Sequence, residues 1–192
     1  CFSEIIKLGK TSLPKYDFHN KKTIENHREI DITNGGIVIV EGLHALNPII
    51  TDNLPQNRLL KIYINVSSRI YDEKNDIVLN KRNMRFVRRM VRDFKFRDSS
   101  VDNTYKLWRN VTAGEDKYLF PFRDNADIKV NTIHLYETCV LKSQALPLLY
   151  ESKISDEFRD DAKKLCKALE KFEDINISSV PEDSLLREFL GR

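Results

Sequence analysis

Arginine side chains recur at helical spacing in one basic segment of the chain. Four of them fall within about 100° of one another on a helix: Arg85, Arg88, Arg89 and Arg92. Guanidinium groups stacked in this way repel one another unless an anion or an acidic partner neutralises them. The planar guanidinium also suits phosphate binding through two parallel hydrogen bonds. Because only Asp93 stands beside these arginines, the pattern favours a phosphate-binding face over an ordinary solvated one.

A carboxylate follows the most apolar stretch of the chain. Residues 37–40 read Ile-Val-Ile-Val, and Glu41 and Gly42 come next. Four β-branched residues without alternation are typical of a strand buried on both faces of a parallel sheet. Ligands of open α/β sheets bind beyond the carboxyl ends of the strands, so Glu41 could hold a metal-bound water or orient a substrate. An acid that only meets solvent at the strand end fits the position equally well.

The elements that must position these groups alternate between strands and helices. Helices are expected over residues 2–8, 48–52, 69–80, 82–96, 135–150, 156–172 and 185–190, with a loop at residues 76–79 as an alternative. A further segment begins at Ser99 or Ser100 and runs to about residue 115. Strands are expected over residues 37–42, 59–66 and 126–131, and residues 13–32 favour a β-hairpin or an extended flap. We expect Phe94 on the apolar side of the Arg-rich helix and a kink or an end at Pro147. The alternation predicts an α/β fold with a mainly parallel sheet.

Composition fits an ordinary soluble domain with one anion-binding place. Of the 192 residues, 41% are hydrophobic and 32% are charged. Ten Lys or Arg and three Asp or Glu lie between Lys81 and Arg109, so this segment carries +7 while the whole chain carries only +3. No apolar run approaches the roughly 18 residues of a membrane span. Three widely spaced cysteines without metal-ligand spacing favour a reducing compartment, and we expect a cytoplasmic protein.

Three segments share their order and spacing with one enzyme family. They are Pro-Lys-Tyr-Asp-Phe at 14–18, Ile-Val-Ile-Val-Glu-Gly-Leu-His-Ala-Leu at 37–46, and Phe-Val-Arg-Arg-Met-Val-Arg-Asp at 86–93, with Arg97 beyond. Together they resemble the uridine kinase and phosphoribulokinase family of P-loop kinases. Residues 118–127, 135–149 and 180–191 are similar to bacterial uridine-kinase-like proteins. The resemblance implies a P-loop kinase-like parallel sheet with flanking helices.

The resemblance also implies chemistry for the matched residues. ATP and Mg²⁺ would be the cofactors, and Glu41 would lie near Mg²⁺ through a water and serve catalysis. Arg89 would approach the sugar or the transferring phosphoryl group, as a catalytic and substrate-binding residue. The ATP phosphates would be bound by Arg88, Arg92 and Arg97.

The flap would contact the nucleobase. Tyr16 and Phe18 could stack on a base, which is worth roughly 1–3 kcal/mol per base. Uridine kinases carry a His a few residues after the Tyr-Asp-Phe, and that position falls near Lys21 here. His19 is a substitute substrate-binding candidate or a flap surface residue. A Gln used for ribose contact in uridine kinases falls at Leu107-Trp108, which is not equivalent.

One family motif does not occur in this sequence. No Gly-x-x-x-x-Gly-Lys-Ser/Thr is present, so the backbone phosphate cradle of P-loop proteins is not encoded in these 192 residues. We therefore expect a fragment that lacks the N-terminal P-loop strand unit and the Asp that acts as the base. In this interpretation residues 1–154 form the C-terminal part of the kinase domain (flap 13–32, core strand 37–42, Arg lid 82–97), and residues 155–192 form a helical tail.

Two functions remain open at this point. The first is ATP-dependent phosphoryl transfer to the hydroxyl of a nucleoside, uridine-like or cytidine-like, or of a related small molecule, with this fragment inactive alone. The alternative is a non-catalytic module that binds RNA or another polyanion through the Arg-rich helix. The aromatic residues are not interleaved with the basic face, so nucleic acid is the less favoured partner. The apolar face of the tail helix is expected to pack on the domain or on a second subunit.

Overall fold

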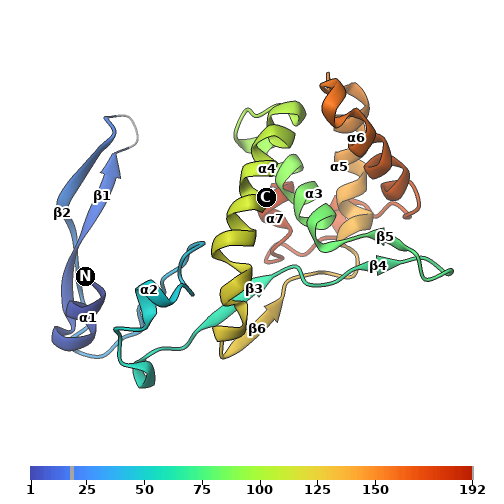
Figure 1. Cartoon of the computed structure of the whole chain (residues 1–192). Helices are drawn as coiled ribbons and strands as arrows, with labels where there is room; N and C mark the ends of the chain where they lie inside the picture. The colour runs from blue at the N-terminus through green and yellow to red at the C-terminus, as the bar shows by residue number, and fades with distance from the viewer. Residues whose placement is uncertain (18–19, 192) are drawn as a thin grey trace. The chain divides into compact units, whose positions relative to one another are not determined.

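The computed structural model describes residues 1–17 and 20–191, which form two compact units. The first unit holds residues 1–63 and 115–128, and the second holds residues 64–114 and those from 129 onward. The helices are α1 (Phe2–Leu8), α2 (Pro48–Thr51), α3 (Lys81–Phe96), α4 (Val101–Tyr118), α5 (Glu137–Glu151), α6 (Asp156–Leu169) and α7 (Arg187–Leu190). The strands are β1 (Lys10–Asp17), β2 (Lys22–Asp31), β3 (Ile62–Asn65), β4 (Ile70–Tyr71), β5 (Ile77–Leu79) and β6 (Ile128–Asn131). Figure 1 shows these elements in chain order.

The expected flap is present as the antiparallel hairpin β1–β2. Its register runs from Lys10 opposite Asp31 to Asp17 opposite Lys22. The register shifts between Leu13 and Lys15, where Pro14 has no N–H to give to the ladder. The hairpin in residues 13–32 is therefore confirmed, although β1 starts three residues earlier than predicted.

The strand predicted at residues 37–42 is wrong for the described chain. Residues 37–41 carry no strand pairing, and the side chains of Ile37 and Ile39 are 91% and 89% exposed. β-Branched residues favour extended backbone, but a strand also needs a neighbour with which to exchange backbone hydrogen bonds. Gly42 has φ of +152°, a conformation that side chains rarely adopt, and its carbonyl accepts from the N–H of Ala45 as the chain turns.

The helix predicted over residues 69–80 is also wrong. This segment forms β4 and β5, an antiparallel pair in which Ile70 lies opposite Leu79. The Asp72 carboxylate accepts from the N–H groups of Lys74 and Asp76, and Asn75 adopts a positive φ of 66°. The side chain thus builds a turn that competes with the first turn of a helix.

Two strands form a small parallel sheet, which confirms the predicted α/β class in part, because the described pairs β1–β2 and β4–β5 are antiparallel. β3 pairs with β6. The carbonyl of Lys61 accepts from the N–H of Asp127, and the carbonyl of Asn65 accepts from the N–H of Thr132, so the register rises along both strands. Helices follow or precede both strands, and the chain is a mixed α/β protein.

The core of the second unit lies between helices. α3 packs against α5 and α7, and α5 packs against α6 (Figure 1). Met90 and Val91 of α3 and Val140 and Leu141 of α5 are fully buried. Two details differ from expectation: Phe94 is 48% exposed, and α5 continues through Pro147 to Glu151. Among the described residues, no helix has both the length and the apolar character needed to span a membrane.

Candidate functional site

α3 positions the arginines through its two ends and its apolar side. Asn80 caps the helix by accepting from the N–H groups of Arg82 and Asn83, while the Asn83 side chain accepts from the N–H of Asn80. This reciprocal cap fixes where the helix begins. Burial of Met90 and Val91 then fixes its rotation, so the guanidinium groups are presented in defined directions.

Three of the predicted site arginines converge on one buried carboxylate, Asp93: Arg89, predicted for catalysis and substrate binding, and Arg92 and Arg97, predicted for the ATP phosphates. Arg89 Nε lies 3.0 Å from Asp93 Oδ2, an ion pair without the alignment of a hydrogen bond. Arg92 Nη2 and Arg97 Nη1 lie 3.2 Å and 3.3 Å from Asp93 Oδ1. The one carboxylate therefore holds three guanidinium groups in a single cluster at the C-terminal end of α3, which we call the Asp93 cluster.

Positive charge exceeds negative charge in the Asp93 cluster. Among the described residues, the only acid other than Asp93 that pairs with an arginine of the cluster is Glu188 of α7. Its Oε1 lies 3.6 Å from Arg92 Nη1. Three guanidinium groups thus face two carboxylates. Lys95 adds a nearby cation: its Nζ donates to the carbonyl of Leu190, and burial lowers the pKa of this ammonium. The surplus of charge-bearing donors suits an additional anion.

Arg88 does not belong to the Asp93 cluster, which corrects the expected stack of four arginines on one face. Arg88 is buried, and its Nε and Nη2 donate to the two carboxylate oxygens of Glu137 at 2.6 and 2.5 Å. Nη2 and Nη1 also donate to the carbonyl and hydroxyl of Thr132. Because its guanidinium donates to Glu137 and Thr132 inside the core, Arg88 stabilises the fold here. Its role on an ATP phosphate stays a prediction.

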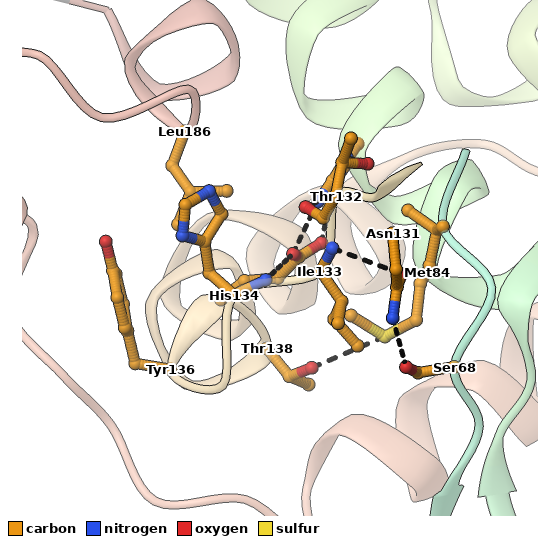
Figure 2. Close-up of polar contacts among 12 residues, drawn as sticks. Ser68, Met84, Asn131, Thr132, Ile133, His134, Tyr136, Thr138 and Leu186 are labelled. Carbon is orange, nitrogen blue, oxygen red and sulfur yellow. Dashed lines mark hydrogen bonds and ion pairs between the residues drawn. The ribbon is translucent and has the colours of Figure 1, made fainter. Parts of the chain in front are cut away.

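Glu137 is itself fixed by the turn that joins β6 to α5 (Figure 2). The N–H of His134 donates to Glu137 Oε2. The Asn131 side chain holds the start of the turn. Its Nδ2 donates to Ser68 Oγ, and its Oδ1 accepts from the backbone N–H of Ile133. Figure 2 also shows the Thr138 hydroxyl directed at the sulfur of Met84, at 3.4 Å. The buried ion pair therefore ties α3 to the loop after the parallel sheet.

Arg85 lies apart from both groups. Its guanidinium carbon is 5.6 Å from the centre of the Trp108 ring on α4, within the range of a cation–π contact. The four arginines of the predicted phosphate-binding face thus divide between an aromatic contact, a buried ion pair and the Asp93 cluster.

Glu41, the predicted metal-side residue, belongs to the first unit. It is exposed and follows the unpaired segment 37–40. It makes no ion pair or hydrogen bond with another described residue. A free carboxylate is the hard oxygen ligand that Mg²⁺ accepts beside its waters, so the residue fits the predicted metal role chemically. The described residues contain no group of three or more His, Cys, Asp or Glu that could hold a metal ion.

Tyr16 also belongs to the first unit, on β1 near the tip of the hairpin. It lies opposite Thr23, and its side chain is 48% exposed. Asp17 shapes the tip by accepting from the backbone N–H and the side-chain amide of Asn20. Phe18 and His19, the other two predicted base contacts, lie outside the described residues.

Sequence reasoning did not assign three acids that organise the site: Asp93, Glu137 and Glu188. Asp93 had a local signal, because Arg89 lies four residues before it on α3 and Arg97 lies four residues after it at the end of the helix. Glu137 is 49 residues from Arg88, and Glu188 is nearly a hundred residues from Arg92, so no helical or strand period connects these pairs.

Comparison with known families gives one match. A family model described as "Phosphoribulokinase / Uridine kinase family" matches residues 1–138. The matched region includes the hairpin, Glu41, all of α3 and Glu137, and it stops before α6 and α7. No solved structure matches the chain significantly.

Proposed function

The chain belongs to the phosphoribulokinase/uridine kinase family, and from that membership we propose that it serves ATP-dependent phosphoryl transfer to a hydroxyl of a nucleoside or a related small molecule. The observation that supports the proposal is the Asp93 cluster, in which Arg89, Arg92 and Arg97 converge on one carboxylate at the C-terminal end of α3. Phosphoryl transfer needs positioned cationic groups on the phosphate oxygens more than it needs covalent chemistry from the protein.

In the proposed mechanism the Asp93 cluster exchanges one anion for another. Asp93 holds the three guanidinium groups together before nucleotide arrives, so little side-chain entropy is lost when phosphate oxygens replace part of its contacts. Arg92 and Arg97 bind the ATP phosphates. Arg89 lies one turn earlier on α3 and contacts the transferring phosphoryl group or the acceptor sugar.

Glu41 and Tyr16 supply the other parts of the proposed site. Glu41 would hold Mg²⁺ through a water, and the ion would supply charge neutralisation on the phosphates. Tyr16 offers an exposed ring on the hairpin for stacking on a nucleobase. A cytoplasmic location is part of the proposal, and the three free cysteines agree with it.

The test is an ATP-turnover assay with a panel of nucleosides. Because the 192-residue sequence has no P-loop signature, the chain is assayed in parallel with the product of its whole reading frame. We expect nucleoside-stimulated release of ADP from the product of the reading frame, and none from the 192-residue chain.

Two variants give the assay its control. Arg89→Gln is expected to lower kcat by about 10²-fold or more, in the range for removing one charge-stabilising donor. Arg159→Gln removes an exposed arginine of α6 outside the family match and is expected to leave the rate unchanged. If the product of the reading frame carries a P-loop and shows no nucleoside-stimulated turnover, the proposal fails. Steeply salt-dependent binding of an oligonucleotide, without turnover, would identify the polyanion-binding alternative instead.

A further inference from the structure

A second candidate site lies in the second unit, between α3, α4 and α6. It is a cavity of about 430 Å³, within the size range of small-molecule pockets. It does not depend on the proposed kinase activity. α6 provides one wall and lies beyond residues 1–138, so the cavity is not made by the family-matched region alone.

The floor of the cavity is aromatic. The ring centres of Phe86 and Tyr105 are 4.3 Å apart, and Tyr105 stacks on Phe158 of α6 at 5.2 Å with an interplanar angle of 15°. Trp108 closes the set, edge-on to Phe86 at 5.6 Å. Phe86, Tyr105 and Phe158 are buried against one another, and the Arg109 guanidinium lies 4.6 Å from the centre of the Phe158 ring. The half-buried Trp108 is therefore the ring that offers flat apolar surface to another flat ring.

One of the side chains that line the cavity carries an unsatisfied polar group. The Tyr105 side chain is buried, and its hydroxyl has no hydrogen-bond partner among the described residues. Buried hydroxyls are almost always hydrogen-bonded, so one without a partner calls for an explanation. Burial raises the pKa of this phenol, which keeps the proton on the oxygen and leaves it able to donate.

The rim of the cavity is cationic. Three cations line it, Arg82, Arg109 and Lys164, against one acid, Asp161. Arg109 is already paired with Glu157 at 2.9 Å, whereas Lys164 makes no ion pair with a described residue. The first turn of α3, with Asn80 and Asn83, lies on the same rim and adds the positive end of a helix dipole.

We propose that this cavity binds a small ligand that joins a flat aromatic ring to an anionic group. The ring lies against Trp108, and the anion faces Lys164. The Tyr105 hydroxyl donates to an acceptor on the ligand. An aromatic carboxylate and a nucleoside monophosphate both have this chemistry, and binding experiments distinguish the two.

The chain carries its own reporter for this site. Trp108 is the single tryptophan of the 192 residues and lines the cavity, so ligand binding changes the only indole fluorescence of the protein. The full 192-residue chain is titrated with 4-hydroxybenzoate and, separately, with uridine monophosphate. Cyclohexanecarboxylate provides the anion without the aromatic ring, and phenol provides the ring without the charge.

We expect a saturable change with at least one of the two aromatic anions, and at least about tenfold weaker binding of cyclohexanecarboxylate and phenol. Saturation with only 4-hydroxybenzoate identifies the carboxylate, and saturation with only uridine monophosphate identifies the nucleotide. Absence of a saturable change with both, or equal binding of cyclohexanecarboxylate or phenol, overturns the proposal.

Matched variants locate the binding. Lys164→Gln is expected to weaken binding by about tenfold, in line with loss of one charged hydrogen bond. Lys163→Gln, the adjacent lysine of α6, lines a different hollow and is expected to change nothing. Tyr105→Phe removes only the unbonded hydroxyl, so it is expected to weaken binding without lowering Tm. Equal effects of the two lysine variants would overturn the assignment.

Discussion

Arg88 and Glu137 form a buried ion pair with two parallel hydrogen bonds, and their side chains are only 8% and 0% exposed. Arg88 stands on α3 among arginines that face solvent or other acids, yet its guanidinium enters the core. The pair joins the Arg-rich helix to the start of α5. It therefore belongs to the framework that holds the Asp93 cluster in place.

Removing one partner of this pair should destabilise the protein. Arg88→Ala leaves Glu137 as an uncompensated buried charge, and we expect a loss of about 3–5 kcal/mol in the free energy of unfolding. Arg159→Ala breaks an exposed pair with Asp156 and should cost no more than about 1 kcal/mol. Urea unfolding followed by circular dichroism measures both.

The double variant Arg88→Met, Glu137→Leu checks the cause. Because it removes both charges and keeps most of the apolar volume, it should be clearly more stable than Arg88→Ala. Equal destabilisation of the single and double variants would mean that the cost arises from packing rather than from the unpaired charge.

Asp93 should compete with bound anions. Asp93→Asn releases three guanidinium groups from a carboxylate, so we expect tripolyphosphate to bind at least about tenfold more tightly. Asp98→Asn is the matched control, because Asp98 is exposed, lies five residues further on, and has a positive φ that Asn tolerates. Isothermal titration calorimetry measures the two affinities. Unchanged affinity in Asp93→Asn would show that Asp93 is not the group that phosphate replaces.

Acid should weaken the link between α4 and the segment before α6. The Lys106 ammonium, and then Ser155, lower the pKa of Asp102 to about 2, below its ordinary 3.8. Since the folded-state pKa is depressed, the carboxylate stabilises the fold above about pH 4, and this contribution is lost as the pH falls from 4 toward 2.

The Asp102 prediction is checked by urea midpoints between pH 5 and pH 2. Asp102→Asn should show a smaller decline than the unmodified chain, and Lys106→Gln should show an intermediate one, because Lys106 is the largest cause of the shift. An identical pH dependence in Asp102→Asn and the unmodified chain would contradict the assignment.

The sequence predicted local elements well and distant partners poorly. α3 was predicted within one residue because its apolar period and its cap lie in one short segment. The strand predicted at residues 37–42 was wrong because a strand also needs a neighbouring strand to pair with, which intrinsic β-propensity cannot supply. The helix predicted at residues 69–80 was wrong because the Asp72 side chain stabilises a turn, which the spacing of apolar residues does not reveal.

In the candidate site too, contacts between residues close in the sequence could be predicted and contacts between distant residues could not. The clustering of Arg89, Arg92 and Arg97 follows from helical spacing, and the structure brings the three together. The inward direction of Arg88 depends on Glu137, which is 49 residues away and has no periodic relation to it. An acid that far along the chain can be assigned to Arg88 only once the packing of α3 on α5 is known.

Tyr16 and Arg89 should affect different kinetic constants if the proposed roles are right. Tyr16→Ala removes stacking on the base, so KM for the nucleoside should rise by about tenfold with little change in kcat. Arg89→Gln should lower kcat instead, because its contact is proposed to strengthen in the transition state. The control is Tyr71→Ala, which removes a tyrosine of similar exposure, 47% against 48%, on β4. Steady-state kinetics of the product of the whole reading frame separate the two constants. A fall in kcat without a rise in KM for Tyr16→Ala would move this residue from base binding to the chemical step.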